Sequence, residues 1–325
     1  MRLVGLFLAS CLASFLLVAC SNVAPVTPVA LTTANAAQSS THLIASRNVQ
    51  IPVTLTVPTD TSSAMPLVVM LHGHGGTRDE AGGFTQIAEE LADAGIASVR
   101  MDFAGCGESS ESFRNNRLST MLADARAARD YAIDTVDVDT NRMGLMGFSM
   151  GGRLAITLAN EDPRFHTLAL WAPSASAGTS GLTNFFGGAD ALATAEARAT
   201  SKGYTSFTTP WGDKQELSAG WFEDMEESKP RELIADYEGA VFVLYGDKDT
   251  VVKPEQATLV ATEATQAYSA WSFELEGADH GLGLFSEEPE LTQIAVSTTV
   301  DAIITGLLDT DGPREQRLGD LNVWK

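Results

Sequence analysis

The sequence is short of positive charge and lacks the motifs of several common chemistries. Its 42 Asp and Glu residues outnumber its 21 Lys and Arg residues, which gives a formal net charge of −21 at pH 7. This balance argues against nucleic acids and strongly anionic molecules as partners, because both are attracted to basic surfaces. The sequence has no block of basic residues and no phosphate-binding loop. His72-Gly73-His74 holds two histidines without a carboxylate or cysteine cluster beside them, so we expect neither a metal nor a cofactor.

Cysteine is also scarce, and two of the three cysteines, Cys11 and Cys20, lie near the N-terminus. A basic start is followed by an apolar run over residues 3–18, which is too short and too early for a comfortable membrane span. These features predict a signal peptide over residues 1–19. Cys106 would then be the only thiol of the folded part, which excludes an intramolecular disulfide. We expect it to be a small core or loop residue rather than a nucleophile.

The end of the apolar run, Leu17-Val18-Ala19-Cys20, resembles a bacterial lipobox. In a lipobox the cysteine is lipidated and becomes the first residue of the mature chain. The resemblance implies that Cys20 anchors the protein to a membrane of the bacterial cell envelope, with residues 20–41 as a flexible tether. Ser21 would direct it to the outer membrane of a Gram-negative cell. An ordinary secretory signal with a chance cysteine is the alternative, and residues 8–11 form a second, weaker match.

The most informative motif is a serine between two glycines. Gly147, Ser149 and Gly151 form a G-x-S-x-G pattern between an apolar run (142–146) and a helix-like segment (152–160). Glycines at these places remove side chains that would clash when a serine is held on a sharp strand-to-helix turn. Such a turn exposes the hydroxyl beside a helix N-terminus, whose amides favour negative charge. The pattern predicts that Ser149 is a nucleophile, although an ordinary strand-to-helix turn can carry the same motif.

A serine hydroxyl needs a base to take its proton and a third group to orient that base. In one known chain order both partners follow the serine, which leaves His166 and His280 as candidate bases. We favour His280, because it lies in a glycine-rich loop after a strand-like run. His166 lies in a helix-to-strand connection, where a solvated surface histidine is expected.

The candidate acid follows the apolar run 241–245, which predicts a buried strand. Two aspartates lie just beyond it, and we favour Asp249, four residues past the run, over Asp247. Asp247 is expected to form a turn by bonding its own backbone. Asp279, next to the candidate base, is expected to cap its own loop.

These segments occur in the order found in alpha/beta-hydrolases, which the chain resembles from about residue 51 to residue 308. Residues 100–109 are similar to the R-x-D-F-x-G-x-G-x-S loop of cinnamoyl (feruloyl) esterases and their relatives near the dienelactone hydrolases. Residues 246–252 and 276–280 are similar to the acid and histidine loops of the same enzymes. Cys106 stands where their first loop usually has a histidine, a departure that bears on the substrate rather than on the fold.

The resemblance also implies an oxyanion hole. One donor is the backbone amide after the nucleophile, that of Met150. The His-Gly loop of these hydrolases is similar to His72–Gly76, which implies a second donor at the backbone N–H of His74. His72 would then be structural, with its ring hydrogen-bonded inside the loop. The alternative is that the whole segment is a tight turn after a core strand.

Strand-like and helix-like runs alternate between residues 97 and 171, which is typical of a parallel sheet covered on both faces. Within residues 118–133 the apolar positions have helical spacing, and residues 48–57 alternate as in an antiparallel strand with one exposed face. We therefore predict an alpha/beta-hydrolase fold, with a mostly parallel sheet between two layers of helices. The domain is expected over residues 42–309, followed by an exposed tail over residues 310–325.

The alternation breaks over residues 174–237, where the resemblance implies a cap insertion over the active site. Aromatic residues there would either line an acyl or aryl pocket or form the small core of the cap itself. Both possibilities stay open for Phe185, Phe186, Tyr204, Phe207, Trp211, Trp221 and Phe222.

The sequence therefore predicts a lipid-anchored serine hydrolase that cleaves short-acyl or hydroxycinnamoyl esters through Ser149, Asp249 and His280. Its partners would be a small-molecule ester and a membrane, and its oligomeric state stays unknown. A serine peptidase of the prolyl-oligopeptidase type is the nearest enzymatic rival, but it usually carries a further N-terminal domain. A non-catalytic envelope lipoprotein that uses the fold for binding is the rival from a different class, although such a protein would be expected to have lost one of the three residues.

Overall fold

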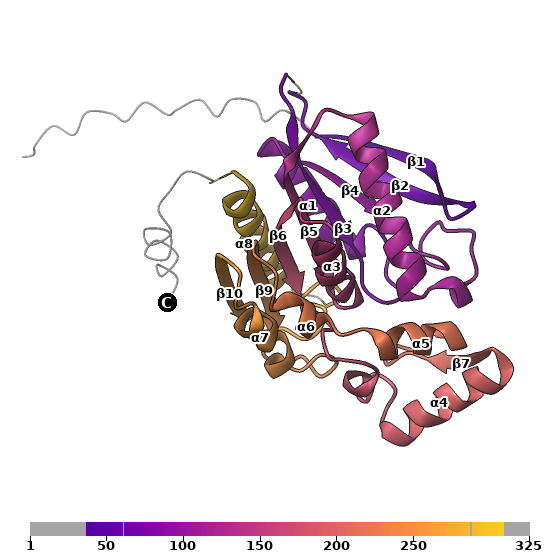
Figure 1. The fold of residues 1–325 in the computed structure, drawn as a ribbon. Helices are drawn as coiled ribbons and strands as arrows, with labels where there is room; N and C mark the ends of the chain where they lie inside the picture. The colour runs from indigo at the N-terminus through magenta and orange to yellow at the C-terminus, as the bar shows by residue number, and fades with distance from the viewer. Residues whose placement is uncertain (1–36, 61, 287, 309–325) are drawn as a thin grey trace, which may run out of the picture. The chain divides into compact units, whose positions relative to one another are not determined.

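The computed structural model describes residues 37–60, 62–286 and 288–308 (Figure 1). The predicted signal peptide (1–19), the lipidation site Cys20 and the C-terminal tail (310–325) lie outside these residues. Most of the predicted tether lies outside them too, but its last four residues, 38–41, belong to a strand that we had not predicted. The tether assignment was therefore too long.

One sheet of eight strands runs through the described chain, in the order β1-β2-β4-β3-β5-β6-β9-β10. The six strands from β4 to β10 in this order pair in parallel, whereas β2 is antiparallel to both β1 and β4. The central strands are apolar and buried on both faces, as expected for a parallel sheet with helices on each side. The strands are β1 (Gln38–Ser46), β2 (Val49–Val57), β3 (Met65–Leu71), β4 (Ala97–Met101), β5 (Val138–Phe148), β6 (Phe165–Trp171), β9 (Ala240–Gly246) and β10 (Ser269–Leu275).

Helices cover both faces of this sheet, and each face has its own hydrophobic core. On one face the core includes side chains of α2 (Leu118–Thr135), α3 (Met150–Glu161) and α7 (Pro254–Glu263). On the other it includes side chains of α1 (Gly83–Asp93) and α8 (Pro289–Leu308). The alpha/beta-hydrolase fold predicted from the sequence is confirmed.

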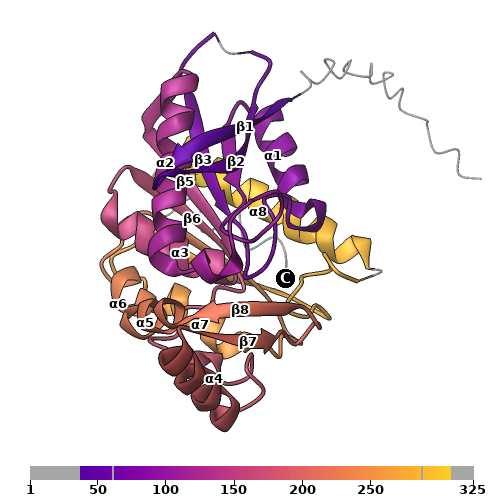
Figure 2. The same ribbon diagram turned by 90° about the vertical axis from the view of Figure 1, so that its right-hand side faces the viewer.

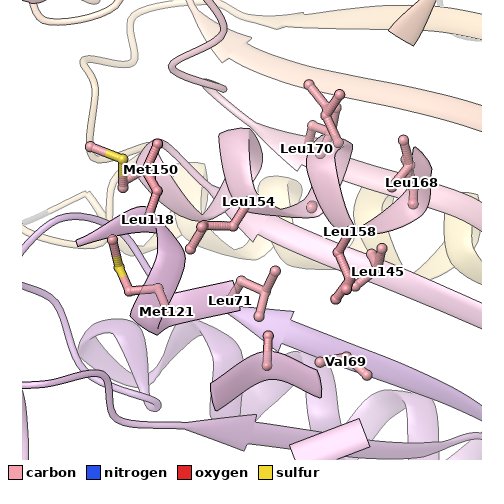
Figure 3. Close-up of a cluster of buried hydrophobic side chains, with 14 of the residues drawn as sticks. Val69, Leu71, Leu118, Met121, Leu145, Met150, Leu154, Leu158, Leu168 and Leu170 are labelled. Atoms are coloured by element: carbon pink, nitrogen blue, oxygen red, sulfur yellow. The ribbon is translucent and has the colours of Figure 1, made fainter. Parts of the chain in front are cut away.

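Helix α3 follows the predicted nucleophile and is fixed by its buried face (Figure 3). Leu154 and Leu158 point into the same cluster as Val69 of β3 and Leu145 of β5, and all four are fully buried. Burying a leucine contributes about 1.5–3 kcal/mol. Such contacts hold the N-terminus of α3 at one place on the sheet.

Helix α8 is long and apolar enough to cross a membrane, judged by length and composition alone. Of its most apolar stretch of 18 residues, 39% is buried in the protein. It contacts β5, β6 and β9 of the sheet as well as α1. On its inner face the Trp171 indole N–H of β6 donates a hydrogen bond to the Thr299 hydroxyl at 2.6 Å. These contacts bury one face of α8 in the hydrophobic core that it shares with α1. We therefore interpret α8 as a core helix that covers the sheet.

A cap insertion lies between β6 and β9, as predicted (Figure 2). It contains a two-stranded antiparallel hairpin, β7 (Tyr204–Thr208) and β8 (Lys214–Ser218), between helices α4 (Ala189–Lys202) and α5 (Ala219–Glu227). The short elements η3 (Ser180–Leu182) and α6 (Pro230–Ile234) flank this unit. The sequence of this region has no single period because helix and strand segments alternate within a few residues.

Strand β2 differs from its prediction, because it is not open on one face. Thr54 and Thr56, on the face expected to be exposed, are 5% and 0% exposed. They accept hydrogen bonds from the side chains of Arg78 and Arg100, at 3.0 and 3.2 Å. The alternation is real, but the polar face is buried under these arginines.

Candidate active site

Ser149 stands on a strained turn between β5 and α3, as its glycine neighbours predict. Its φ of 52° lies in the left-handed region, which a residue other than glycine adopts only when the surrounding structure holds it there. A Cβ atom at Gly151 would lie 1.8 Å from the carbonyl oxygen of Leu71, and one at Gly147 would lie 2.3 Å from the carbonyl oxygen of Gly151. Gly151 therefore packs against the end of β3 and Gly147 against the first turn of α3, each so closely that only glycine fits.

The structure brings Ser149, His280 and Asp249 together in a line of hydrogen bonds. The His280 Nε2 atom lies 3.0 Å from the Ser149 Oγ atom, and its Nδ1 atom lies 2.7 Å from Asp249 Oδ2. The other carboxylate oxygen of Asp249 accepts hydrogen bonds from the backbone N–H groups of Val251 and Val252, at 2.8 and 2.9 Å. The Asp249 side chain is fully buried, so its carboxylate has one fixed orientation toward the imidazole.

The topology explains how residues so far apart in the chain meet. Ser149, Asp249 and His280 follow β5, β9 and β10, and the carboxyl ends of parallel strands lie at one edge of a sheet. The ends of β9 and β10 are in register, with Gly246 opposite Leu275, so the two loops begin side by side.

The other histidine and aspartates considered for the base and the acid lie outside this line of hydrogen bonds. His166 lies exposed near the amino end of β6, away from the carboxyl edge. Asp279 accepts the Gly281 N–H at 2.9 Å and so caps its own loop, as predicted. Asp247 differs from its prediction, because it accepts a hydrogen bond from Gly277 N–H at 2.5 Å and not from its own turn. It ties the acid loop to the histidine loop.

His72 is a structural residue of the His-Gly loop, as predicted. Its Nε2 atom accepts the Phe103 N–H at 3.1 Å, so the proton is on Nδ1, which donates to the Gly73 carbonyl at 2.7 Å. Burial lowers the pKa of His72 to about 4, so the ring is neutral at pH 7.

Glu80 is a buried carboxylate beneath the same loop that the sequence did not reveal. It is 2% exposed and accepts a hydrogen bond from Gly73 N–H at 2.8 Å. Burial raises its pKa to about 7, and in the described part of the chain no ion pair involves it. Glu80 and Ala81 have φ values of 40° and 52°, so two residues hold strained backbone at this place. In the sequence Glu80 follows the polar residues 77–79, and nothing there indicates that its side chain is buried.

The residues of the two predicted oxyanion donors flank a contact between the His-Gly loop and the turn of the nucleophile. The carbonyls of Leu71 and His72, at the start of the loop, pack against Gly151. Met150 is the first residue of α3, and His74 follows two residues after His72. Among the described residues, neither the His74 nor the Met150 backbone N–H donates an intramolecular hydrogen bond.

The side chain of His74 contacts the cap, which the sequence did not predict. Its Nε2 atom lies 2.7 Å from Oε1 of Gln215, a residue of β8. The ring packs edge-on against Phe113, Phe185 and Trp221, with centroid distances of 5.3, 5.1 and 6.0 Å. Burial lowers the pKa of His74 to about 4, so this ring is neutral as well.

Cys106 lies in the loop after β4 and is 4% exposed, which agrees with the prediction of a small loop or core residue. Burial raises the pKa of its thiol to about 12, so it carries no thiolate at neutral pH. The same loop is organised by Asp102, which accepts the backbone N–H groups of Arg78 and Glu108 at 2.7 and 2.9 Å. The Arg78 guanidinium completes the arrangement through ion pairs with both acids.

The aromatic residues of the cap mainly form its own core. Phe185, Phe186, Trp221 and Phe222 are between 0% and 9% exposed and contact one another. The other three are more open: Trp211 is 50% exposed and contacts Phe185, Phe207 is partly buried against Phe185 and Phe186, and Tyr204 is partly buried with the Arg114 guanidinium 3.5 Å from its ring centroid. The second of the two predicted possibilities, a cap core, therefore holds for these four residues.

Comparisons with known proteins agree with this fold. Residues 62–219 match the Hydrolase_4 family model, described as serine aminopeptidase, S33. The chain is 34% identical over 105 residues to the quorum-quenching protein AidA of Acinetobacter baumannii, a match that covers 32% of this chain and 34% of AidA. It is 26% identical over 227 residues to Lipase 1 of Psychrobacter immobilis, which covers 62% of this chain and 67% of the lipase. The chain thus spans about a third of AidA and two thirds of the lipase.

Solved structures resemble the chain over most of its length. Est1E from Butyrivibrio proteoclasticus with bound ferulic acid has a TM-score of 0.64 at 18% identity, with 81% of this chain and 99% of Est1E covered. A putative dienelactone hydrolase from Klebsiella pneumoniae has a TM-score of 0.57 at 15% identity, with 83% and 99% covered. At such identities the likeness shows the fold alone, and with the order of the strands it gives this chain the alpha/beta-hydrolase fold.

Proposed function

We propose that the chain is a serine esterase that hydrolyses carboxylic esters of short acyl or hydroxycinnamoyl groups. The observation that carries the proposal is the position of His280, whose two ring nitrogens face Ser149 Oγ at 3.0 Å and Asp249 Oδ2 at 2.7 Å. A nucleophile within hydrogen-bond reach of a base, with that base oriented by a third group, is the arrangement that serine acyl transfer requires.

In the first step His280 Nε2 takes the hydroxyl proton as Ser149 Oγ attacks the ester carbonyl carbon. Asp249 accepts the Nδ1–H and stabilises the imidazolium, and its own orientation is fixed by two backbone N–H groups. The backbone N–H groups of Met150 and His74 are the proposed donors to the oxyanion. The attack gives a tetrahedral intermediate. It breaks down to the acyl-enzyme when the bond between the carbonyl carbon and the alcohol oxygen cleaves and the alcohol leaves with the proton from His280.

In the second step water takes the place of the alcohol. His280 removes a proton from the water as its oxygen attacks the acyl carbon, and the proton returns to Ser149 Oγ as the ester bond to the enzyme breaks. The products are the carboxylic acid and the free serine. No step needs a thiolate, which agrees with the buried, protonated Cys106.

An ester substrate is favoured over a peptide by the relatives that the chain resembles. Est1E was solved with ferulic acid, and the Psychrobacter relative is named a lipase. The family description, serine aminopeptidase, keeps a peptidase as the second candidate. Both candidates share the acyl-enzyme mechanism, so only the leaving group distinguishes them.

Hydrolysis by the wild type, Ser149→Ala and Ser201→Ala tests the proposal, the last being a control at an exposed serine of α4. The substrates are p-nitrophenyl acetate, p-nitrophenyl octanoate, methyl ferulate and an alanine p-nitroanilide. We expect Ser149→Ala to lose about 10⁶ in kcat on the preferred ester and Ser201→Ala to lose nothing. Equal activity in all three proteins contradicts the serine mechanism, and a preference for the anilide favours the peptidase.

We also propose that the protein is held in the bacterial cell envelope by a lipid on Cys20, which lies outside the described residues. The support is the Leu17-Val18-Ala19-Cys20 sequence at the end of an apolar run. Membrane fractionation of the full chain and of Cys20→Ser tests it, with Cys11→Ser as the matched control. Loss of the membrane-bound fraction in Cys20→Ser alone is expected, and an unchanged fraction contradicts the proposal.

A further inference from the structure

Among the residues that the structure describes, one buried hydrogen bond connects the cap to the His-Gly loop. Gln215 lies on β8 of the cap hairpin, is 8% exposed, and its Oε1 atom lies 2.7 Å from Nε2 of His74. The two residues are 141 positions apart in the chain. The Gln215 amide also covers Gly75, because a Cβ atom there would lie 2.4 Å from Gln215 Nε2.

His74 has one end at the proposed oxyanion hole and the other in the cap. Its backbone N–H is the proposed second donor, and its ring packs between Phe185 and Trp221 of the cap and Phe113 of the main domain. The contacts that hold the ring therefore also limit where the peptide that carries the donor can lie.

Gln215 is the polar group that fixes the His74 ring. An amide oxygen only accepts, so Nε2 carries the proton and Nδ1 does not. The Nδ1 atom is buried and has no hydrogen-bond partner among the described residues. Without Gln215 the Nε2–H would also be buried without a partner, so neither ring nitrogen would have a hydrogen bond. The ring would then move to find water.

Other polar contacts join the cap to the main domain away from the His-Gly loop. Asn184 Nδ2 donates to the Thr250 carbonyl, beside Asp249, at 3.5 Å, and Arg231 pairs with Glu263. Arg114 pairs with Glu216, and both side chains are 43% exposed. Arg117, which precedes α2, pairs with Asp224 of α5 in the cap. Arg153 of α3 is fully buried and donates to backbone carbonyls at the two ends of the cap. These contacts attach the cap, whereas Gln215 alone among them contacts the loop of the proposed oxyanion hole.

We propose that Gln215 is a positioning residue, which holds His74 so that its backbone N–H faces the oxyanion only while the cap is seated on the main domain. Docking of the cap and completion of the oxyanion hole are then one event. This inference rests on the proposed esterase function. Its consequence is that a cap residue without contact to the reacting atoms changes turnover and not substrate binding.

The test compares Gln215→Met, which keeps the side-chain length but removes the acceptor, with Lys214→Ala, a control at the exposed neighbouring position of β8. We measure kcat, KM and inhibition by a trifluoromethyl ketone that matches the preferred ester. In Gln215→Met we expect kcat to fall ten- to a hundredfold, KM to change less than about threefold, and the ketone to bind weaker by the same factor as kcat. Lys214→Ala should behave as the wild type.

A double-variant cycle decides whether the effect passes through His74. In His74→Phe the ring nitrogens are absent, so adding Gln215→Met should lower kcat less than threefold further. Unchanged kcat and ketone inhibition in Gln215→Met, a rise in KM alone, or additive effects in the cycle overturn the proposal. Gln215→Asn, which keeps an amide but is one carbon too short for the bond, replaces Gln215→Met if the latter does not fold, and thermal unfolding monitors this. Absence of Ser149-dependent hydrolysis in the wild type overturns the esterase function itself, together with this inference.

Discussion

Glu80 makes the stability of the folded chain depend on pH in a way that can be calculated. Glu80 is 2% exposed, and burial raises the pKa of its carboxyl group from 4.5 to about 7. Because the folded pKa is the higher one, the stabilisation is complete below the unfolded pKa of about 4.5 and is lost as the pH rises through about 7. A shift of this size corresponds to about 3 kcal/mol, since each pK unit is worth about 1.4 kcal/mol.

Glu80→Gln removes this pH dependence while keeping the local geometry. The amide oxygen of glutamine can accept the Gly73 N–H as the carboxylate does, and glutamine mimics the protonated acid. We expect the two proteins to have equal free energies of unfolding near pH 4.5. Above pH 7 the variant should be more stable by about 3 kcal/mol.

Urea unfolding between pH 4.5 and 8 measures the difference, with Glu89→Gln, at an exposed glutamate of α1, as the matched control. The control should follow the wild type at every pH. A constant difference between wild type and Glu80→Gln across this range would show that Glu80 is ionised throughout, and the account of the buried carboxyl given above would be wrong.

Three further predictions concern the site and the cap. Asp249→Asn should lower kcat about 10⁴-fold, because the imidazole loses its orienting carboxylate, whereas Asp247→Asn should stay within tenfold in the same ester assay. Gly151→Ala should yield no folded protein by circular dichroism, since the new Cβ atom would lie 1.8 Å from the Leu71 carbonyl oxygen; a folded, active variant would contradict the packing of the turn. Arg153→Ala removes the donor to two carbonyls of the cap and should lower the free energy of unfolding by about 2–4 kcal/mol, measured in urea, with faster proteolysis of the cap. An unchanged rate of proteolysis would show that Arg153 does not hold the cap on the main domain.

The residues that the sequence revealed are those whose local neighbours carry a signal. Ser149 is marked by two glycines that the close packing of the turn requires, and His280 and Asp249 each follow an apolar run that predicts a strand. Parallel strands bring their carboxyl ends together, so three local patterns in the right order were enough to predict one site. The order of the strands in the sheet was not needed for this inference.

The residues that the sequence did not reveal depend on contacts between distant segments. Gln215 meets His74 across 141 positions, and nothing in the hairpin sequence distinguishes it from a solvated glutamine. Arg153 is fully buried without an ion pair in the described part of the chain, although an arginine on a helix is normally predicted to be exposed. Strand β1 was missed because seven of its nine residues are exposed and give no clear apolar alternation. In each case the tertiary structure, and not the local sequence, determines the environment.

Strained backbone around the candidate site is also only partly predictable from the local sequence. Ser149, Ala172 and Glu80 have φ values of 52°, 38° and 40°, yet only Ser149 has a glycine two positions before it and another two positions after it. Ser149 N–H donates to the Trp171 carbonyl, and Ala172 N–H donates to the Leu244 carbonyl, so the strained peptides of neighbouring loops are tied to the ends of β6 and β9. Strain of this kind persists only where the surrounding structure over-determines it. The geometry of the nucleophile is therefore set by the assembled sheet, and variants that loosen the ends of these strands should lower activity before they unfold the protein.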